Sequence, residues 1–179
     1  ESTVGAFLLR ARREGLRDFG ACMSPHSAWL ILQGIETLGL RMQRHMQNTE
    51  AVVAFLATHP MVERVGHPIL ESHPSHAMAK KLLPRGAGSV FSFDIKGSRE
   101  RGQAFVETLK VFSHLANVGD CRSLVIQPAS TTHFRMDAAA LKQAGISPGT
   151  IRLSIGLEDA DDLIDDLKRA LRAAEKVGA

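Results

Sequence analysis

Apolar and polar residues alternate most regularly near the end of the chain, over residues 150–156. Ile151, Leu153 and Ile155 fall on one face of an extended chain, and Arg152 falls on the other. A period of two over this length is typical of a β-strand that buries one face. The pattern therefore predicts a core strand with a guanidinium on its second face.

Apolar patterns elsewhere in the chain, and the turn residues that separate them, predict the other strands and the shorter helices. Other strands are expected at residues 62–66, 89–95, 113–118 and 123–126, the third of them running into a tight turn at Gly119 and Asp120. Helices are expected at 75–83, 98–109, 137–145 and from Asp159 onward. Strands and helices alternate, and the strands are short. We therefore predict an α/β fold with helices packed on one face of a small, largely antiparallel sheet.

The strongest helical pattern covers residues 24–59. Ser24 is a favourable N-cap, and Pro25 suits the first helical position because its missing N–H is not needed there. Apolar residues recur at steps of three and four as far as His59, and the next residue is a proline. One long connecting helix is expected. Two consecutive helices, with a bend near Gly34 or Gly39, are the alternative.

The first 21 residues are rich in Ala, Leu and Arg and are not expected to fold alone. A short helix interrupted by Gly15 and Gly20 is expected there. We interpret residues 1–23 as the remnant of a larger neighbouring domain. Residues 24–59 are then the connecting helix, and residues 60–179 a small C-terminal domain.

Composition narrows the class of protein. The chain has 179 residues, 44% of them apolar, and its net charge of +3 is spread along the sequence. Without a basic run interleaved with aromatic residues, binding to nucleic acid is not expected. Neither a membrane helix nor a signal peptide is expected from the hydrophobic pattern. Cys22 and Cys121 read as reduced thiols of a cytoplasmic protein.

Two groups of residues carry candidate chemistry. The planar fork of Arg152 suits a carboxylate or a phosphate, although spacing alone favours an internal salt bridge with Asp120 or Glu158. Asn117, read by itself, is a turn-forming residue before Gly119. The loop histidines have a plausible metal-ligand spacing, but we expect no metal, because ligand sets normally converge from three or four donors. These histidines are His67, His73 and His76.

Several segments together resemble the Cys/Met-metabolism enzymes that use pyridoxal 5′-phosphate (PLP), the fold-type I transferases and lyases. The resemblance covers nearly the whole chain. The matching segments are residues 15–20, 32–38 with 40–42, 112–120, 128–133 and 151–159. Within this family, the Asn-Val-Gly-Asp of residues 117–120 looks like the O-acetylhomoserine sulfhydrylase branch. The lyase and cystathionine synthase branches usually carry Ser-Leu-Gly there.

The resemblance implies roles for particular residues. Arg152 matches the arginine that binds the substrate α-carboxylate, Asn117 matches the position that assists it, and Thr132 matches a threonine lining the same region. The Schiff-base lysine and the other PLP-binding residues belong to the preceding large domain of the family. No lysine of this chain has the matching motif. The resemblance therefore implies the small C-terminal domain of a fold-type I transferase, with PLP bound mainly by the domain that this chain lacks.

The activity implied is replacement of the γ-acetoxy group of O-acetylhomoserine by sulfide or a thiol, giving homocysteine or methionine. The chain alone is expected to be inactive, and the family implies a homotetramer. Two rivals stay open. One is a cystathionine γ-synthase or γ-lyase on the same scaffold. The other is a non-catalytic domain that only oligomerises.

Overall fold

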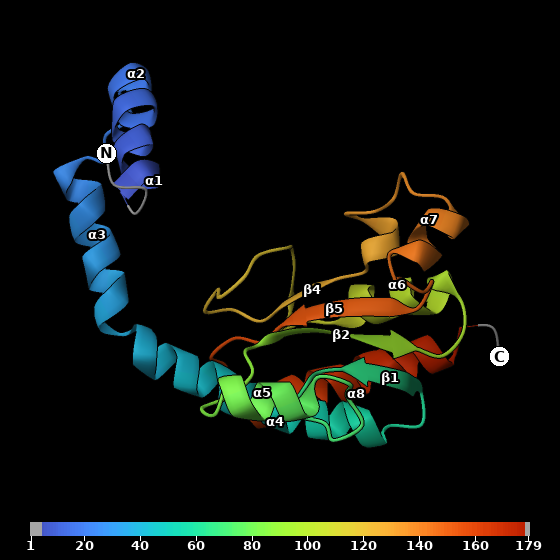
Figure 1. Cartoon of the computed structure of the whole chain (residues 1–179). Coiled ribbons are helices and arrows are strands. Elements are labelled where there is room, and N and C mark those ends of the chain that lie inside the picture. The colour runs from blue at the N-terminus through green and yellow to red at the C-terminus, as the bar shows by residue number, and fades with distance from the viewer. Residues whose placement is uncertain (1–4, 178–179) are drawn as a thin grey trace. The chain divides into compact units, whose positions relative to one another are not determined.

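The computed structural model describes residues 5–177, and the chain divides into two compact units, Glu1–Gly39 and Leu40–Ala179. Each unit is described by itself. Figure 1 shows helices alone in the first unit and a sheet with helices in the second. Residues 1–4 of the predicted segment 1–23, and residues 178 and 179 of the predicted C-terminal domain, lie outside the described residues. The three predicted domain ranges remain predictions.

The first unit begins with one helical run. It consists of α1 (Ala6–Arg10), a π-helical stretch, η2 (Ala11–Leu16), and α2 (Arg17–Phe19). Gly20 ends the run in the left-handed conformation, with φ +68°, and its N–H donates to Leu16 O at 2.9 Å. The prediction of a helix ended by Gly20 is confirmed. The expectation that Gly15 also interrupts it is wrong, because the π-helical turn continues through that residue.

Two helices, not one, occupy the predicted connecting segment. They are α3 (Pro25–Glu36) and α4 (Leu38–Thr58), and Thr37 between them has φ −100° and ψ 4°, outside the helical range. The predicted start is confirmed, since the Ser24 side chain accepts from Ser27 N–H at 3.1 Å and Pro25 is the first helical residue. The single long helix was therefore the wrong alternative. Gly34 and Gly39 lie on either side of the break and weaken helical continuity there.

The second unit is built on a five-stranded sheet with the order β1-β2-β5-β4-β3. Figure 1 shows β4, β5, β2 and β1 side by side. All neighbouring pairs are antiparallel except β3 with β4, so the predicted largely antiparallel sheet is confirmed. The strands are β1 (Val62–Gly66), β2 (Val90–Ile95), β3 (Ser113–His114), β4 (Leu124–Ile126) and β5 (Thr150–Ser154).

Three helices pack against one face of this sheet. They are α4, α6 (Arg99–Thr108) and α8 (Ala160–Glu175). The inward residues of β5, Ile151 and Leu153, are fully buried among them, as is Leu167 of α8. Alternation in β2 and β5 and the three- and four-residue spacing in the helices place all of these apolar side chains in one core. The predicted layer of helices on the sheet is confirmed.

The remaining elements lie in the connections. They are α5 (His76–Leu82), the 3₁₀ turn η3 (Pro128–Ser130) and α7 (Ala138–Gln143), whose first turn is capped by Asp137. Among the described residues, no helix has the length and apolar character needed to cross a membrane.

Candidate functional site

Arg152 lies in the middle of β5 and points to the face of the sheet opposite the core. Its strand neighbours Ile151 and Leu153 are fully buried, whereas Arg152 is half-buried. Its cross-strand partners are Ser92 on β2 and Ile126 on β4. Directly opposed residues share a face, so the guanidinium lies among one polar and one apolar neighbour. The face predicted for Arg152 is confirmed.

The loop between β3 and β4 brings Asn117 to Arg152. Arg152 Nη2 donates to the backbone oxygen of Asn117 at 3.3 Å. The Asn117 side chain is bonded within its own turn, accepting from Val118 N–H at 2.8 Å and donating to Asp120 at 3.4 Å. Gly119 has φ +75°, which a side chain would disfavour. The structure therefore joins the two predicted residues through the Asn117 carbonyl, and the Asn117 amide shapes the turn.

A shallow hollow lies beside this contact. Its walls come from the loop, β4 and β5, and consist of Leu115, Ala116, Asn117, Leu124, Ile126, Arg152 and Ser154. Ligand pockets usually measure about 300–1,000 Å³, whereas the volume that a water-sized molecule could enter here is about 0 Å³, so in this chain the hollow is one shallow wall and not a closed pocket. Ser154 Oγ is buried here without a hydrogen-bond partner among the described residues.

The internal salt bridge considered for Arg152 is not formed. Among residues 5–177, Arg152 makes no ion pair. Asp120 accepts from Arg122 N–H at 3.0 Å, and Glu158 accepts from Ser123 N–H at 2.7 Å. With both carboxylates bonded elsewhere, the guanidinium keeps donors for an external anion.

Thr132 lies in the exposed turn after η3, and its hydroxyl bonds His133 Nδ1 at 2.8 Å. It is not among the described residues that line the Arg152 hollow. Its predicted place in the substrate region stays a prediction.

The loop histidines are engaged with backbone groups. His67 Nδ1 accepts from Ile69 N–H at 3.2 Å, His73 Nδ1 accepts from Ser75 N–H at 3.1 Å, and His76 Nδ1 is 2.9 Å from Pro68 O. Within the described part of the chain, no three His, Cys, Asp or Glu side chains converge as metal ligands would. Burial lowers the pKa of His67, which is 2% exposed.

The residues described do not themselves fit a lysine-bound PLP. The lysines are all exposed, and none of them lines the Arg152 hollow. A lysine that bonds a cofactor must reach the ligand pocket with its Nζ, which these side chains do not do. The lysines are Lys80, Lys81, Lys96, Lys110, Lys142, Lys168 and Lys176.

Several polar residues that hold this site in place carry no local sequence pattern that predicts their role. Ser123, just before β4, donates to Glu158 in the segment after β5, and His45 and Asn48 are buried polar residues of α4. His45 and Asn48 can be singled out by position, since they interrupt an otherwise apolar helical stripe. Their partners are backbone oxygens far along the chain, which no local pattern identifies.

Comparison with known proteins decides the family. The model for the Cys/Met metabolism PLP-dependent enzymes matches residues 5–172. The chain belongs to this family. It is 49% identical over 168 residues to an O-acetyl-L-homoserine sulfhydrylase from Leptospira meyeri, covering 93% of this chain and 38% of that protein. It is 46% identical to O-acetyl-L-homoserine sulfhydrylase 1 from Thermus thermophilus, with 93% and 39% covered.

The fold agrees with a solved member of the family. A Campylobacter jejuni protein described as a putative O-acetylhomoserine (thiol)-lyase superimposes with a TM-score of 0.87 and 43% identity, over 96% of this chain and 41% of that one. That structure contains N′-pyridoxyl-lysine-5′-monophosphate. The predicted likeness to the O-acetylhomoserine sulfhydrylase branch is confirmed. This chain spans about two fifths of the length of these relatives.

Proposed function

We propose that this chain is the C-terminal part of a PLP-dependent O-acetylhomoserine sulfhydrylase and that it supplies the carboxylate-binding end of the substrate site. The observation that carries the proposal is the Arg152 guanidinium, which borders a small hollow and pairs with no carboxylate of the described chain. An amino-acid substrate brings the carboxylate that its fork matches.

The proposed reaction joins sulfide or a thiol to the γ-carbon of O-acetylhomoserine and releases acetate, so that homocysteine or methionine forms. PLP supplies the electron-withdrawing chemistry when bound, and the rest of the protein holds it. Arg152 and the Asn117 loop fix one end of the substrate, which orients the reacting carbons by positioning alone. We propose Thr132 as a further residue of the same substrate region.

A chimera tests this proposal. Residues 5–172 replace the matching part of the Leptospira meyeri enzyme, to which this chain is 49% identical, and the product is assayed with O-acetylhomoserine and sulfide. We expect turnover, with PLP absorbance like that of the parent. Arg152→Ala should lower kcat/KM by about 30- to 1,000-fold, since loss of one partner of a desolvated charge pair costs roughly 2–4 kcal/mol.

An arginine away from the candidate site provides the control for Arg152→Ala. Arg85→Ala removes an exposed arginine in the turn after α5 and should leave kcat/KM within about twofold. If Arg152→Ala also left kcat/KM within about twofold, the carboxylate assignment would be wrong.

The substrates that the chimera uses distinguish the rival functions. Reaction of cysteine with the homoserine ester, or release of a thiol from methionine, in place of sulfide addition would favour the γ-synthase or γ-lyase rival. A folded chimera without any turnover would favour the oligomerisation domain.

We also propose a cytoplasmic homotetramer. Cys22 and Cys121 are both exposed free thiols, which suits a reducing compartment. The described residues of the first unit expose many large apolar side chains, which suits burial in an assembly. Light scattering of the chimera at micromolar concentration should give four times the protomer mass, and a constant monomer mass would contradict the tetramer.

A further inference from the structure

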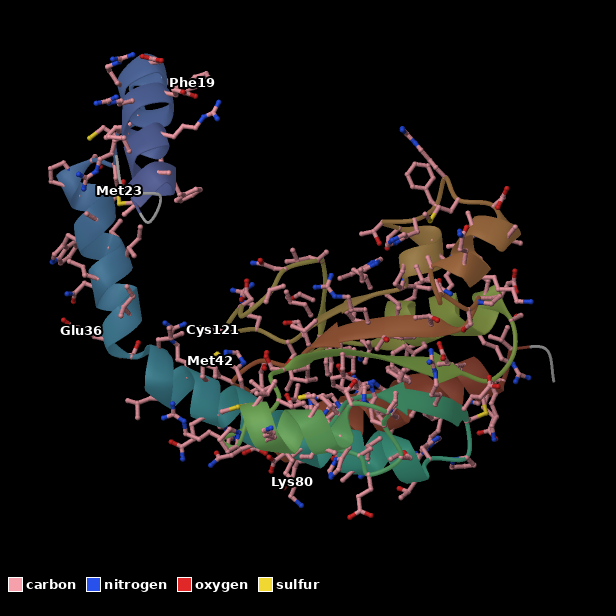
Figure 2. All side chains as sticks on the ribbon, viewed as in Figure 1. Phe19, Met23, Glu36, Met42, Lys80 and Cys121 are labelled. Carbon is pink, nitrogen blue, oxygen red and sulfur yellow. The ribbon has the colours of Figure 1, made fainter. Side chains whose placement is uncertain are left out.

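The segment that joins β5 to α8 is bonded along one side to the loop that carries Asn117. Leu157 N–H donates to Cys121 O at 2.9 Å, and Gly156 N–H donates to Ser123 Oγ at 2.7 Å. Figure 2 labels Cys121, which lies in this loop between β3 and β4. Together with the bond from Arg152 to the Asn117 carbonyl, these contacts run the length of the loop.

Glu158 closes the contact between the two segments. Its carboxylate accepts from both Ser123 N–H, at 2.7 Å, and the Ser123 hydroxyl, at 2.8 Å. Ser123 is fully buried, and the same hydroxyl accepts from Gly156. Hydrogen bonds to an ionised acceptor are stronger than neutral ones. Ser123 is therefore held by the segment 156–158 through its amide and through both roles of its hydroxyl.

The two segments approach too closely for any side chain at Gly156. A Cβ there would lie 2.5 Å from both Cys121 O and the carbonyl carbon of Arg122. These are backbone atoms, which cannot rotate away. The glycine therefore lets the loop pack directly on the end of β5.

The opposite side of the same segment is fixed to α4. His45 Nδ1 lies 2.6 Å from Ile155 O, and Asn48 Nδ2 donates to Gly156 O at 3.0 Å and to Glu158 O at 2.8 Å. His45 and Asn48 are each 1% exposed. The segment thus presents its carbonyls to a core helix and its N–H groups and carboxylate to the loop, which fixes the loop to the core.

We propose that Ser123 and Glu158 are positioning residues for substrate binding. They hold the loop where its Asn117 carbonyl accepts from Arg152, and this bond fixes the guanidinium beside the hollow that Arg152 lines. The inference rests on the proposed carboxylate site. It adds two residues that touch neither substrate nor cofactor and act only through Arg152.

The first test measures the loop in the chain itself, without any reaction. In a Cys22→Ser background, a nitroxide label on the exposed Cys121 thiol reports the motion of the loop. Ser123→Ala and Glu158→Ala should each shift the spectrum toward the mobile component. Glu158→Gln keeps an acceptor for Ser123 N–H and should give a smaller shift. Glu71→Gln, at an exposed carboxylate before α5, should give none.

Amide exchange in β2 and β5 controls for the fold in the same variants. Protection there should match that of the parent while the label becomes mobile. An unchanged label spectrum in both alanine variants, or a loss of protection across the whole sheet in step with the label, would overturn the proposal.

The second test separates positioning from the site itself. In the chimera, Ser123→Ala and Glu158→Ala should raise KM about tenfold with kcat within about twofold, because a misplaced binding group weakens ground state and transition state alike. Glu158→Gln should restore part of the loss. If Arg152→Ala raises KM and the two alanine variants do not, the positioning role is wrong and the carboxylate site stands. If Arg152→Ala leaves both KM and kcat/KM unchanged as well, the carboxylate site on which the proposal rests is wrong.

Discussion

At the scale of single residues, Arg152 and Asn117 contribute to the candidate site in different ways. Arg152 offers a charged side chain to the hollow, whereas Asn117 offers its backbone oxygen to Arg152 and keeps its amide within the turn. A backbone carbonyl is present whatever the side chain. Substitution of Asn117 therefore acts through the shape of the turn, and substitution of Arg152 acts on the binding group.

In the chimera, Asn117→Ala should lower kcat/KM by only about 2- to 13-fold. This corresponds to the roughly 0.5–1.5 kcal/mol of a lost neutral hydrogen bond. Arg152→Lys should recover little of the Arg152→Ala loss, because an ammonium cannot reproduce the planar fork. Steady-state kinetics at fixed sulfide measures both. A larger loss for Asn117→Ala than for Arg152→Ala would reverse the assignment of roles.

His67 makes stability depend on pH. Burial is the main cause that lowers its pKa, with nearby His73 acting in the same direction and the bond to Gly88 O and the charge of Glu50 opposing it. The unfolded chain then binds the proton more readily than the folded chain does, so stability falls as pH drops below about 6.5 and is fully present above it.

Urea unfolding at pH 7.5 and pH 5.5 measures this effect. The free energy of unfolding should be lower at pH 5.5, and the difference between the two pH values should shrink in His67→Gln. His133→Gln removes a half-buried histidine in the turn after η3 and serves as the control. An equal pH dependence in the parent and in His67→Gln would show that His67 is not the source.

At the scale of elements, α8 anchors the strand that leads into the Asn117 loop. Asp166, 1% exposed, accepts from the backbone N–H groups of Lys110, Val111 and Phe112 at 2.7–3.3 Å and pairs with Arg169. These amides precede β3 and have no partner in the sheet. The Asp166 carboxylate therefore supplies the hydrogen-bond acceptors that a neighbouring strand would otherwise provide.

Asp166→Asn should lower the free energy of unfolding by about 2–4 kcal/mol. The amide keeps one acceptor oxygen and brings a donor against backbone N–H groups, and it leaves buried donors unpaired. Asp165→Asn, at the neighbouring exposed pair with Lys168, should change it by less than about 1 kcal/mol. Urea denaturation of both variants gives the comparison. Equal effects would mean that the backbone bonds of Asp166 add little.

At the scale of the whole molecule, the two units differ in how they bury apolar residues. In the second unit, apolar side chains of three helices and the sheet form one core. In the described part of the first unit, Phe7 is 81% exposed, Phe19 86% and Trp29 55%. Figure 2 labels Phe19 on this unit. Apolar surface of this extent is typical of an interface.

The isolated chain should therefore self-associate. Light scattering should give a mass that rises with concentration, and Phe7→Gln with Phe19→Gln should lower it. Phe134→Gln, at an exposed phenylalanine of the second unit, is the matched control and should have no effect. A monomer mass throughout, in the parent chain, would contradict the prediction.

Local pattern determined much of this protein. The period-two alternation in β2 and β5, the caps at Ser24, Asp137 and Asp159 and the stripe of α8 all produced the expected elements, because each depends on neighbours within about four residues. The face of Arg152 followed from the same alternation. The four residues 117–120 were enough to indicate the sulfhydrylase branch, because a family motif is a property of adjacent residues.

Tertiary structure alone decided how the candidate site is held. Arg152 bonds the Asn117 carbonyl, and Glu158 and Asp166 bond amides 35 or more residues away. These bonds join segments that no periodicity relates. The excluded salt bridge shows this most clearly. Asp120 and Glu158 were plausible partners by charge and spacing. Asp120 instead accepts from Arg122 N–H within its own turn, and Glu158 accepts from Ser123 N–H, which only the fold brings close. Such amides are identical at every residue, so only their positions in space select which carboxylate they bind.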